Sequence, residues 1–203
     1  MFIIGITGGT GAGKTSALKA LTALGAKVID CDELYHRLIV HDNDLKSELS
    51  ARFDKVLRDG AIDRKHLGKI VFNDPRALED LNAITHKYVD AEIQRQLSDW
   101  AEQGETVAAI DAIALIESGL SKKCDITVAI FAPREARIVR IMIRDKITHE
   151  QAYARISAQK SDDFYIENSD YSLEGNYATE KEFEEVCKSF FEQILINHNL
   201  GGH

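Results

Sequence analysis

Residues 2–15 read FIIGITGGTGAGKT, and residues 27–32 read KVIDCD. The first six residues predict a short buried strand, and the glycines from Gly8 to Gly13 predict a turn. Apolar side chains between residues 17 and 24 then recur at helical spacing, and Gly25 ends that helix. Residues 27–29 predict a second strand. A strand, a loop, a helix and another strand in this order form the unit of a parallel sheet flanked by helices.

The middle of the chain alternates a helical block with apolar strands. Residues 34–104 predict helices with no convincing strand, broken at the Asn73-Asp74-Pro75 turn. Residues 107–111 and 126–131 predict two further strands. The helical block is therefore expected to be an insertion between strands of one sheet.

The C-terminal part predicts helices with recognisable first turns. Pro133 begins a helical stretch that runs through Arg144. Two capping boxes follow, Thr148 with Gln151 and Thr179 with Glu182. The second box opens a helix with one apolar stripe, formed by Phe183, Val186, Cys187, Phe190, Phe191, Ile194 and Leu195. The polar residues 160–168 are expected to be mobile.

Composition excludes several classes of protein. The 203 residues carry 33 acidic and 25 basic side chains, a formal charge of −8. That balance argues against general nucleic-acid binding, which needs a cationic surface, but permits a small polyanion in a locally positive cleft. Three widely spaced cysteines without a C-x-x-C pair predict a reducing compartment, and no apolar stretch is long enough to cross a membrane. We expect a cytoplasmic protein that binds neither nucleic acid nor membrane.

The glycine-rich turn carries the strongest chemical signal. Residues 8–15 fit the P-loop pattern G-x-x-x-x-G-K-[ST], between a strand and a helix as that motif requires. Its backbone N–H groups and the following helix would surround phosphate oxygens, Lys14 would reach the β- and γ-phosphates, and the Thr15 hydroxyl would bind Mg²⁺. The predicted contacts to ATP are Gly11, Ala12, Gly13, Lys14, Thr15 and Ser16. The alternative, a chance match, does not explain this strand–loop–helix context.

A P-loop alone does not say what is done with the nucleotide. A GTPase would also carry an N-K-x-D motif after a later strand. The nearest stretch, residues 122–125 (KKCD), lacks the asparagine and precedes a strand. Larger ATPases need a longer chain, so a small kinase is the remaining interpretation.

A kinase needs acids for the metal and for the acceptor. Asp111 ends an apolar strand, where a metal-holding acid would lie; the alternative is an aspartate that caps a helix. Asp30 and Asp32 flank the end of the second strand, where ligands bind in α/β proteins. In extended chain they would point the same way, and one could orient the acceptor hydroxyl or accept its proton. The alternative is that both only form a turn.

Three arginines lie on one face of the helix that follows Pro133. Arg137, Arg140 and Arg144 are spaced three and then four residues apart, which suits a lid that closes over a triphosphate. Arg155 on the next helix could join them. A solvated basic helix face is the competing interpretation.

These features resemble the dephospho-CoA kinase family. The match includes residues 5–15 and the V-I-D-C-D run at 28–32, where the family has D-A-D. It continues in family order with residues 59–64 (DGAIDR), 81–86 (LNAITH), 117–120 (ESGL), the arginine helix and 155–159 (RISAQ). The family usually has proline where this chain has Lys87 and Ile113, and its late A-D-x-x-I-x-N element is matched only loosely, ending at Asn176.

The resemblance implies an α/β fold of the nucleoside-monophosphate-kinase-like P-loop type, a five-stranded parallel sheet flanked by helices. The implied parts are a core (1–31, 104–133 and 162–203), an acceptor-binding insertion (32–103) and a lid (134–161). The implied enzyme uses ATP and Mg²⁺ to phosphorylate the ribose 3′-hydroxyl of dephospho-CoA in coenzyme A synthesis. We expect it to be a monomer.

The resemblance also implies roles for single residues. Asp32 would be the acceptor-side acid, and His86 would line the acceptor pocket. Arg140 and Arg144 would clamp the triphosphate, and Thr15 and Asp111 would hold the metal. Two rival functions stay open at this point. One is another small-molecule P-loop kinase with a nucleotide or sugar acceptor, and the other is a nucleotide-dependent switch that signals to a protein partner.

Overall fold

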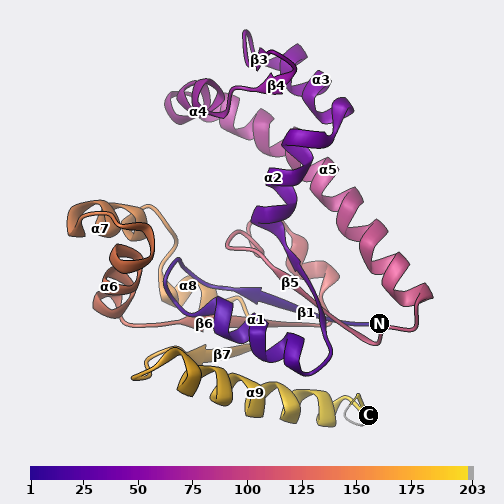
Figure 1. Cartoon of the computed structure of the whole chain (residues 1–203), viewed down its shortest axis with the longest axis vertical. Helices are drawn as coiled ribbons and strands as arrows, with labels where there is room; N and C mark the ends of the chain where they lie inside the picture. Colours follow the sequence, from indigo (N-terminus) through magenta and orange to yellow (C-terminus); the bar gives the residue numbers. More distant parts are fainter. Residues whose placement is uncertain (201–203) are drawn as a thin grey trace. The chain divides into compact units, whose positions relative to one another are not determined.

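The structure is a computed structural model that describes residues 1–200 (Figure 1). The chain forms two compact units. One contains Met1–Ile29 and the chain from Trp100 onward, and the other contains Asp30–Asp99. Within residues 1–200, no helix is both long and apolar enough to span a membrane.

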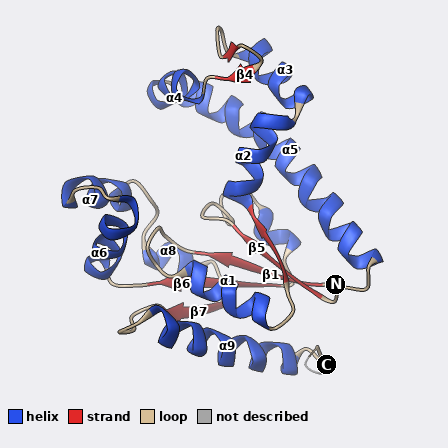
Figure 2. Cartoon of the chain, viewed as in Figure 1, coloured by secondary structure: helices blue, strands red, loops and turns tan. Residues whose placement is uncertain are grey.

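The first unit is built on a five-stranded parallel sheet, as predicted. Its strands are β1 (Phe2–Thr7), β2 (Lys27–Asp30), β5 (Val107–Asp111), β6 (Ile126–Phe131) and β7 (Tyr171–Glu174). Their order across the sheet is β2-β5-β1-β6-β7. Figure 2 draws the strands in red and labels β5, β1, β6 and β7 of this sheet. The central strand β1 is bonded on both sides, with Ile4 opposite Ala109 of β5 and opposite Ile126 of β6. Sequence patterns located four of these strands, and β7 is the fifth.

Several helices belong to this unit. They are α1 (Lys14–Ala23), α6 (Arg134–Asp145), α7 (His149–Ser157), α8 (Asp162–Glu167) and α9 (Glu180–Asn197), with a short 3₁₀ turn η1 at Leu120–Lys123. Helices α1 and α9 pack together in one core with β1 and β6 (Figure 1). The predicted stripe on α9 lies in this core, where Phe183, Cys187 and Phe191 are buried. Full burial of such side chains contributes roughly 1.5–3 kcal/mol each.

Caps explain where several helices begin or end. Gly25 follows the C-cap of α1 with a φ of 87°, and the Thr148–Gln151 capping box of α7 is complete, both as predicted. The second predicted box forms only in part. Thr179 accepts a hydrogen bond from Glu182 N, but the Glu182 carboxylate accepts from Ala178 N. The reciprocal bond is therefore displaced by one residue.

The segment 160–168, expected to be mobile, is mostly helical. Helix α8 spans Asp162–Glu167, and the Ser161 side chain caps it by accepting from Phe164 N. Tyr165 of this helix is buried, with an exposed fraction of 1%. The buried Tyr165 ring and the Ser161 cap therefore stabilise a helix in a segment whose sequence is mostly polar.

The second unit is helical. It contains α2 (Cys31–His41), α3 (Asn43–Arg52), α4 (Arg64–Asn73) and most of α5 (Pro75–Glu102). Its core includes Leu45, Leu49, Phe53 and Val56, all nearly inaccessible to water.

This unit also holds a hairpin that the sequence analysis missed. The two-residue strands β3 (Leu57–Arg58) and β4 (Ala61–Ile62) pair antiparallel around Asp59-Gly60. Both turn residues have positive φ, 49° and 77°. Asp-Gly is a strong hairpin signal because it tolerates positive φ at both positions. The expectation that residues 34–104 contain no strand was therefore wrong.

Candidate active site

The phosphate-binding loop lies at the carboxyl edge of the sheet, between β1 and α1. Gly8 has a φ of 130°, and a Cβ built there would lie 1.9 Å from the carbonyl oxygen of Ile130 on β6. A side chain is therefore excluded at the point where the chain leaves the sheet. The buried Thr7 hydroxyl donates to Ile113 O at 3.1 Å, which ties β1 to the loop after β5. Ile113 stands where the family usually has proline, and the bond from Thr7 still anchors the loop at this residue.

The residues predicted to contact ATP surround the first turn of α1. Gly13 is the N-cap with a φ of 115°, and the first turn of α1 contains no acidic residue. The positive end of the helix therefore faces the loop without a competing carboxylate. Lys14 donates from Nζ to Gly8 O at 3.1 Å, so its ammonium lies over the loop. Ala12 and Ser16 are buried, while Thr15 is exposed.

Asp111 lies at the same edge. It ends β5, pairs in register with Ile6 of β1, and is half-buried. A carboxylate and a hydroxyl, here Asp111 and Thr15, are oxygen donors of the kind that Mg²⁺ uses together with phosphate oxygens and water. In the described chain no group of three or more His, Cys, Asp or Glu side chains could hold a metal ion. The donor set fits a metal bound jointly with the nucleotide.

The three lid arginines differ in what they contact. Arg137 and Arg140 on α6 reach the P-loop backbone. Arg140 donates to Gly11 O at 3.1 Å and to Gly175 O at 2.6 Å. Gly175 approaches the loop so closely that a Cβ there would lie 2.2 Å from Ala12 O. Asn176, where the loosely matched late element of the family ends, is exposed and directly follows this contact.

Arg144, at the end of α6, contacts a carboxylate instead of the loop. Its guanidinium donates to both oxygens of Asp145, at 2.7 and 3.0 Å. Arg155 of α7 pairs with the same carboxylate. The hydrogen bond from Arg144 and the adjacent positive charges lower the pKa of Asp145 to about 2. Arg155 and Arg144 are therefore linked by the carboxylate of Asp145 that they share. Arg155 pairs with that carboxylate and not with the P-loop.

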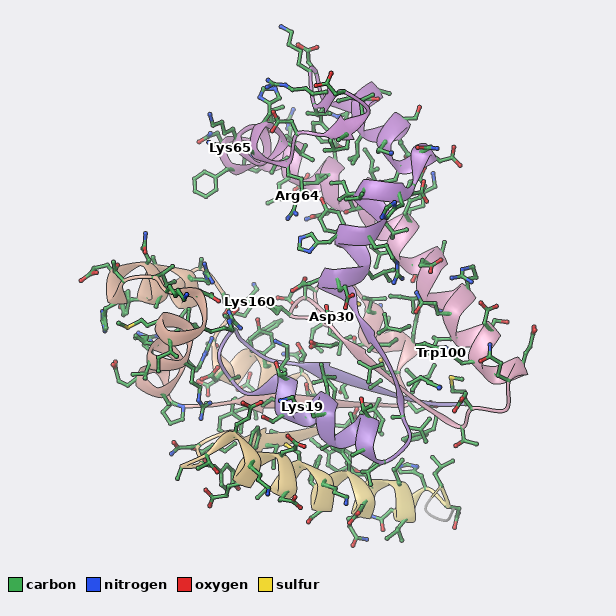
Figure 3. All side chains as sticks on the ribbon, viewed as in Figure 1. Lys19, Asp30, Arg64, Lys65, Trp100 and Lys160 are labelled. Atoms are coloured by element: carbon green, nitrogen blue, oxygen red, sulfur yellow. The ribbon has the colours of Figure 1, made fainter. Side chains whose placement is uncertain are left out.

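The two aspartates after β2 have different surroundings, and the expectation of extended chain between them was wrong. Helix α2 begins at Cys31, directly after the strand. Asp30 (labelled in Figure 3) is its N-cap and accepts from Asp32 N at 2.9 Å and Glu33 N at 3.0 Å. The Asp32 carboxylate lies in the first helical turn and is exposed. A cap fixes the backbone of Asp32 and leaves its side chain available to a substrate.

His86, the predicted acceptor-pocket residue, is exposed on α5 in the second unit. The adjacent Lys87 stands where the family usually has proline, and it pairs with Glu48 of α3 at 3.0 Å. Tyr88 donates to the same carboxylate at 2.8 Å, which raises the pKa of Tyr88 to about 12. Lys87 thus continues α5 and joins it to α3.

Sequence reasoning missed two polar residues that contact the P-loop or its arginine. Gln159 binds Thr10 through both ends of its side-chain amide. Asp162 pairs with Arg137 at 2.7 Å. Gln159 belongs to the RISAQ stretch that matched the family, and this was the available signal.

The fold and the site define the class. A parallel sheet whose first strand runs through a G-x-x-x-x-G-K-T loop into a helix, with arginines of a separate helical hairpin on that loop, is a P-loop kinase of the nucleoside-monophosphate-kinase-like type.

Comparison with known proteins places the chain within that class. The family model for dephospho-CoA kinase matches residues 2–181. A dephospho-CoA kinase of Dehalococcoides mccartyi is 35% identical over 178 residues, 87% of this chain and 89% of the relative. One from Moorella thermoacetica is 39% identical over 162 residues, 78% and 76% of the two chains. The solved dephospho-CoA kinase from Campylobacter jejuni is 26% identical, with a TM-score of 0.68 over 97% of this chain and 98% of that one. The chain belongs to the dephospho-CoA kinase family.

Proposed function

We propose that this protein transfers the γ-phosphate of ATP to the ribose 3′-hydroxyl of dephospho-CoA, which yields coenzyme A and ADP. The observation that carries the proposal is the complete P-loop at the sheet edge of a chain of this family. The 3′ oxygen forms a bond to γ-phosphorus while the bond to the bridging oxygen of ADP breaks, and the hydroxyl proton leaves to a base.

The P-loop residues bind and orient the triphosphate. The first turn of α1 presents backbone N–H groups, and Lys14 places a cation among the phosphates. Thr15 and Asp111 would hold Mg²⁺, which would supply positive charge to offset that of the triphosphate. Because phosphoryl transfer requires little covalent chemistry from the protein, alignment and charge stabilisation are its main contributions.

Asp32 acts on the acceptor in this proposal. Strand β2 ends at the same sheet edge as β1, and Asp32 follows the strand by two residues, on a helical turn fixed by the Asp30 cap. Its carboxylate would orient the 3′-hydroxyl and accept its proton. His86 would contribute to the acceptor pocket. Arg140 and Arg144 would stabilise charge on the triphosphate, which for Arg144 requires release from Asp145 on nucleotide binding.

The test is an acceptor screen with the purified protein. ADP release from ATP is measured with dephospho-CoA, nucleoside monophosphates or gluconate, and the product is identified by mass. We expect ADP release that depends on dephospho-CoA and a product heavier by one phosphoryl group. Turnover with another acceptor would indicate a different small-molecule kinase, and tight nucleotide binding without acceptor dependence would indicate a switch.

We also propose that the enzyme works as a monomer in the cytoplasm. The cysteines support a reducing compartment, because they are three in number, widely spaced and without a pairing motif. Analytical ultracentrifugation of the full chain measures the oligomeric state, and a dimer at assay concentration would contradict the monomer.

A further inference from the structure

We propose that Arg137 and Gln159 are positioning residues that hold the P-loop in its nucleotide-binding shape through Thr10. The inference rests on one part of the proposed function, namely that the loop binds ATP. The identity of the acceptor does not enter it. Arg137 comes from the three-arginine stripe, but the structure gives it a different role from a phosphate clamp.

Thr10 lies in the middle of the loop, and all three of its polar groups are bonded to these two side chains. Its N–H donates to Gln159 Oε1 at 2.9 Å, and its hydroxyl accepts from Gln159 Nε2 at 2.8 Å. Its carbonyl oxygen accepts from Arg137 Nε at 2.9 Å. A residue bonded at its amide, carbonyl and side chain has little freedom to rotate.

Arg137 is itself held rigidly. Its exposed fraction is 3%, and its guanidinium donates to Asp162 at 2.7 Å and to Gln159 at 3.0 Å. Burial lowers the pKa of Arg137 from its ordinary value, and Asp162 opposes that shift by stabilising the cation. A buried guanidinium with a carboxylate partner and two further acceptors is a fixed anchor.

The loop is shaped to receive this anchor. A Cβ on Gly9 would lie 2.1 Å from Arg137 Nη2, so a side chain at this position would displace the guanidinium from where it lies. Arg137 comes from α6, Gln159 follows α7, and Asp162 begins α8. Two segments distant in sequence from the P-loop therefore contact Thr10, and a third holds Arg137 through Asp162.

Anchoring matters because a glycine-rich loop is flexible in the unbound state. Ordering such a loop on binding would weaken nucleotide affinity, whereas a loop held in place beforehand avoids that cost. Loss of the anchor should therefore weaken binding of ATP and ADP and raise KM for ATP. KM for the acceptor should stay unchanged, because neither side chain faces that substrate in the proposal.

The test is calorimetric titration of Thr10→Val, Gln159→Leu and the double variant with ADP, without any acceptor. Thr10→Val removes one hydroxyl, and Gln159→Leu removes both amide contacts at similar volume. We expect Gln159→Leu to weaken ADP binding about tenfold, and the double variant to be no weaker than Gln159→Leu, because the two side chains act as one unit. Arg137→Lys keeps a cation for Asp162 but cannot donate to all three partners, and should fall between Gln159→Leu and wild type.

The matched control is Gln151→Ala, which removes a glutamine from the same helical hairpin. Gln151 closes the capping box of α7 and makes its hydrogen bond to Thr148 N. The control should lower stability of the hairpin and leave ADP affinity unchanged. Hydrogen exchange of the amides of residues 9–13 should be faster in Gln159→Leu than in this control.

Two results would overturn the inference. One is wild-type ADP affinity in Gln159→Leu, and the other is equal weakening by Gln151→Ala, which would assign the effect to lid stability. A wild-type protein that binds ADP tightly but ignores dephospho-CoA would refute the proposed acceptor and leave the anchoring result intact. The two failures are therefore distinguishable.

Discussion

Replacing Asp32 with asparagine tests the acceptor-side acid. Asn keeps the size and one acceptor oxygen, but removes the charge and the ability to accept a proton. Asp32 is exposed, and the hydrogen bond that fixes it runs from its own backbone N–H to the Asp30 carboxylate. That bond does not involve the Asp32 side chain, so the start of α2 should stay intact in Asp32→Asn.

The size of the effect on stability follows from the helix. Asp32 is the second residue of α2, where a negative charge interacts favourably with the helix dipole by about 0.3–1 kcal/mol. Unfolding free energy should therefore fall by less than about 1 kcal/mol. The loss of a general base should lower kcat by roughly 10²–10⁴-fold. A rate loss of that size is about 3–5 kcal/mol, well beyond the change in stability.

Glu33→Gln is the matched control, because it removes a carboxylate from the same helical turn, one residue further on. Both variants and wild type are measured by steady-state kinetics with dephospho-CoA, by calorimetric titration with ATP, and by urea denaturation. Only Asp32→Asn should lose kcat, with ATP affinity unchanged in both. Near wild-type turnover of Asp32→Asn, or an equal loss in Glu33→Gln, would refute the assignment.

Three further perturbations test other parts of the molecule. Lys14→Ala should lower turnover by at least about 10²-fold with an unchanged circular dichroism spectrum, because it removes the cation over the phosphates; an active variant would exclude this lysine from the mechanism. Asp145→Asn should be less stable than wild type at neutral pH. Since the pKa of Asp145 is lowered from 3.8 to about 2, the difference in unfolding free energy should be constant above pH 5 and shrink as pH falls below 4; a difference that grows in acid would contradict the ion pairs. Leu49→Ala, at a fully buried position, should cost about 2–5 kcal/mol in urea denaturation while ADP affinity stays at the wild-type value; a loss of affinity would show that the P-loop depends on this core.

Local sequence signals were enough to predict most of the fold. The P-loop context, the glycine after α1, the Thr148–Gln151 box and the stripe on α9 each depend on residues close together in the chain. Such signals act within one or two helical turns, so a single sequence contains them fully. The sheet class followed from the order of strands and helices.

Some of the parts that were missed depend on partners far away in sequence. Strand β7 is short and mostly exposed, and it is a strand because it pairs with β6. Arg137 shares its helical face with Arg140 and Arg144, so spacing cannot tell which of the three is buried. Its burial is decided by Gln159 and Asp162, which lie 22 and 25 residues further on. The capping role of Asp30 was a local signal, but the interpretation of residues 30–32 as extended chain concealed it.

The strand order has a consequence for how the chain acquires its fold during synthesis. Both hydrogen-bonding neighbours of β1 lie beyond residue 106, since Phe2 pairs with Val107 and Ile4 with Ile126. At about 5–20 residues per second, the ribosome needs on the order of ten seconds to complete them. The core of residues 30–99 is complete by then, so the helical unit can become compact while the nascent P-loop strand still awaits its sheet. Contacts across such long separations form slowly, so we expect the sheet to assemble after the helical unit.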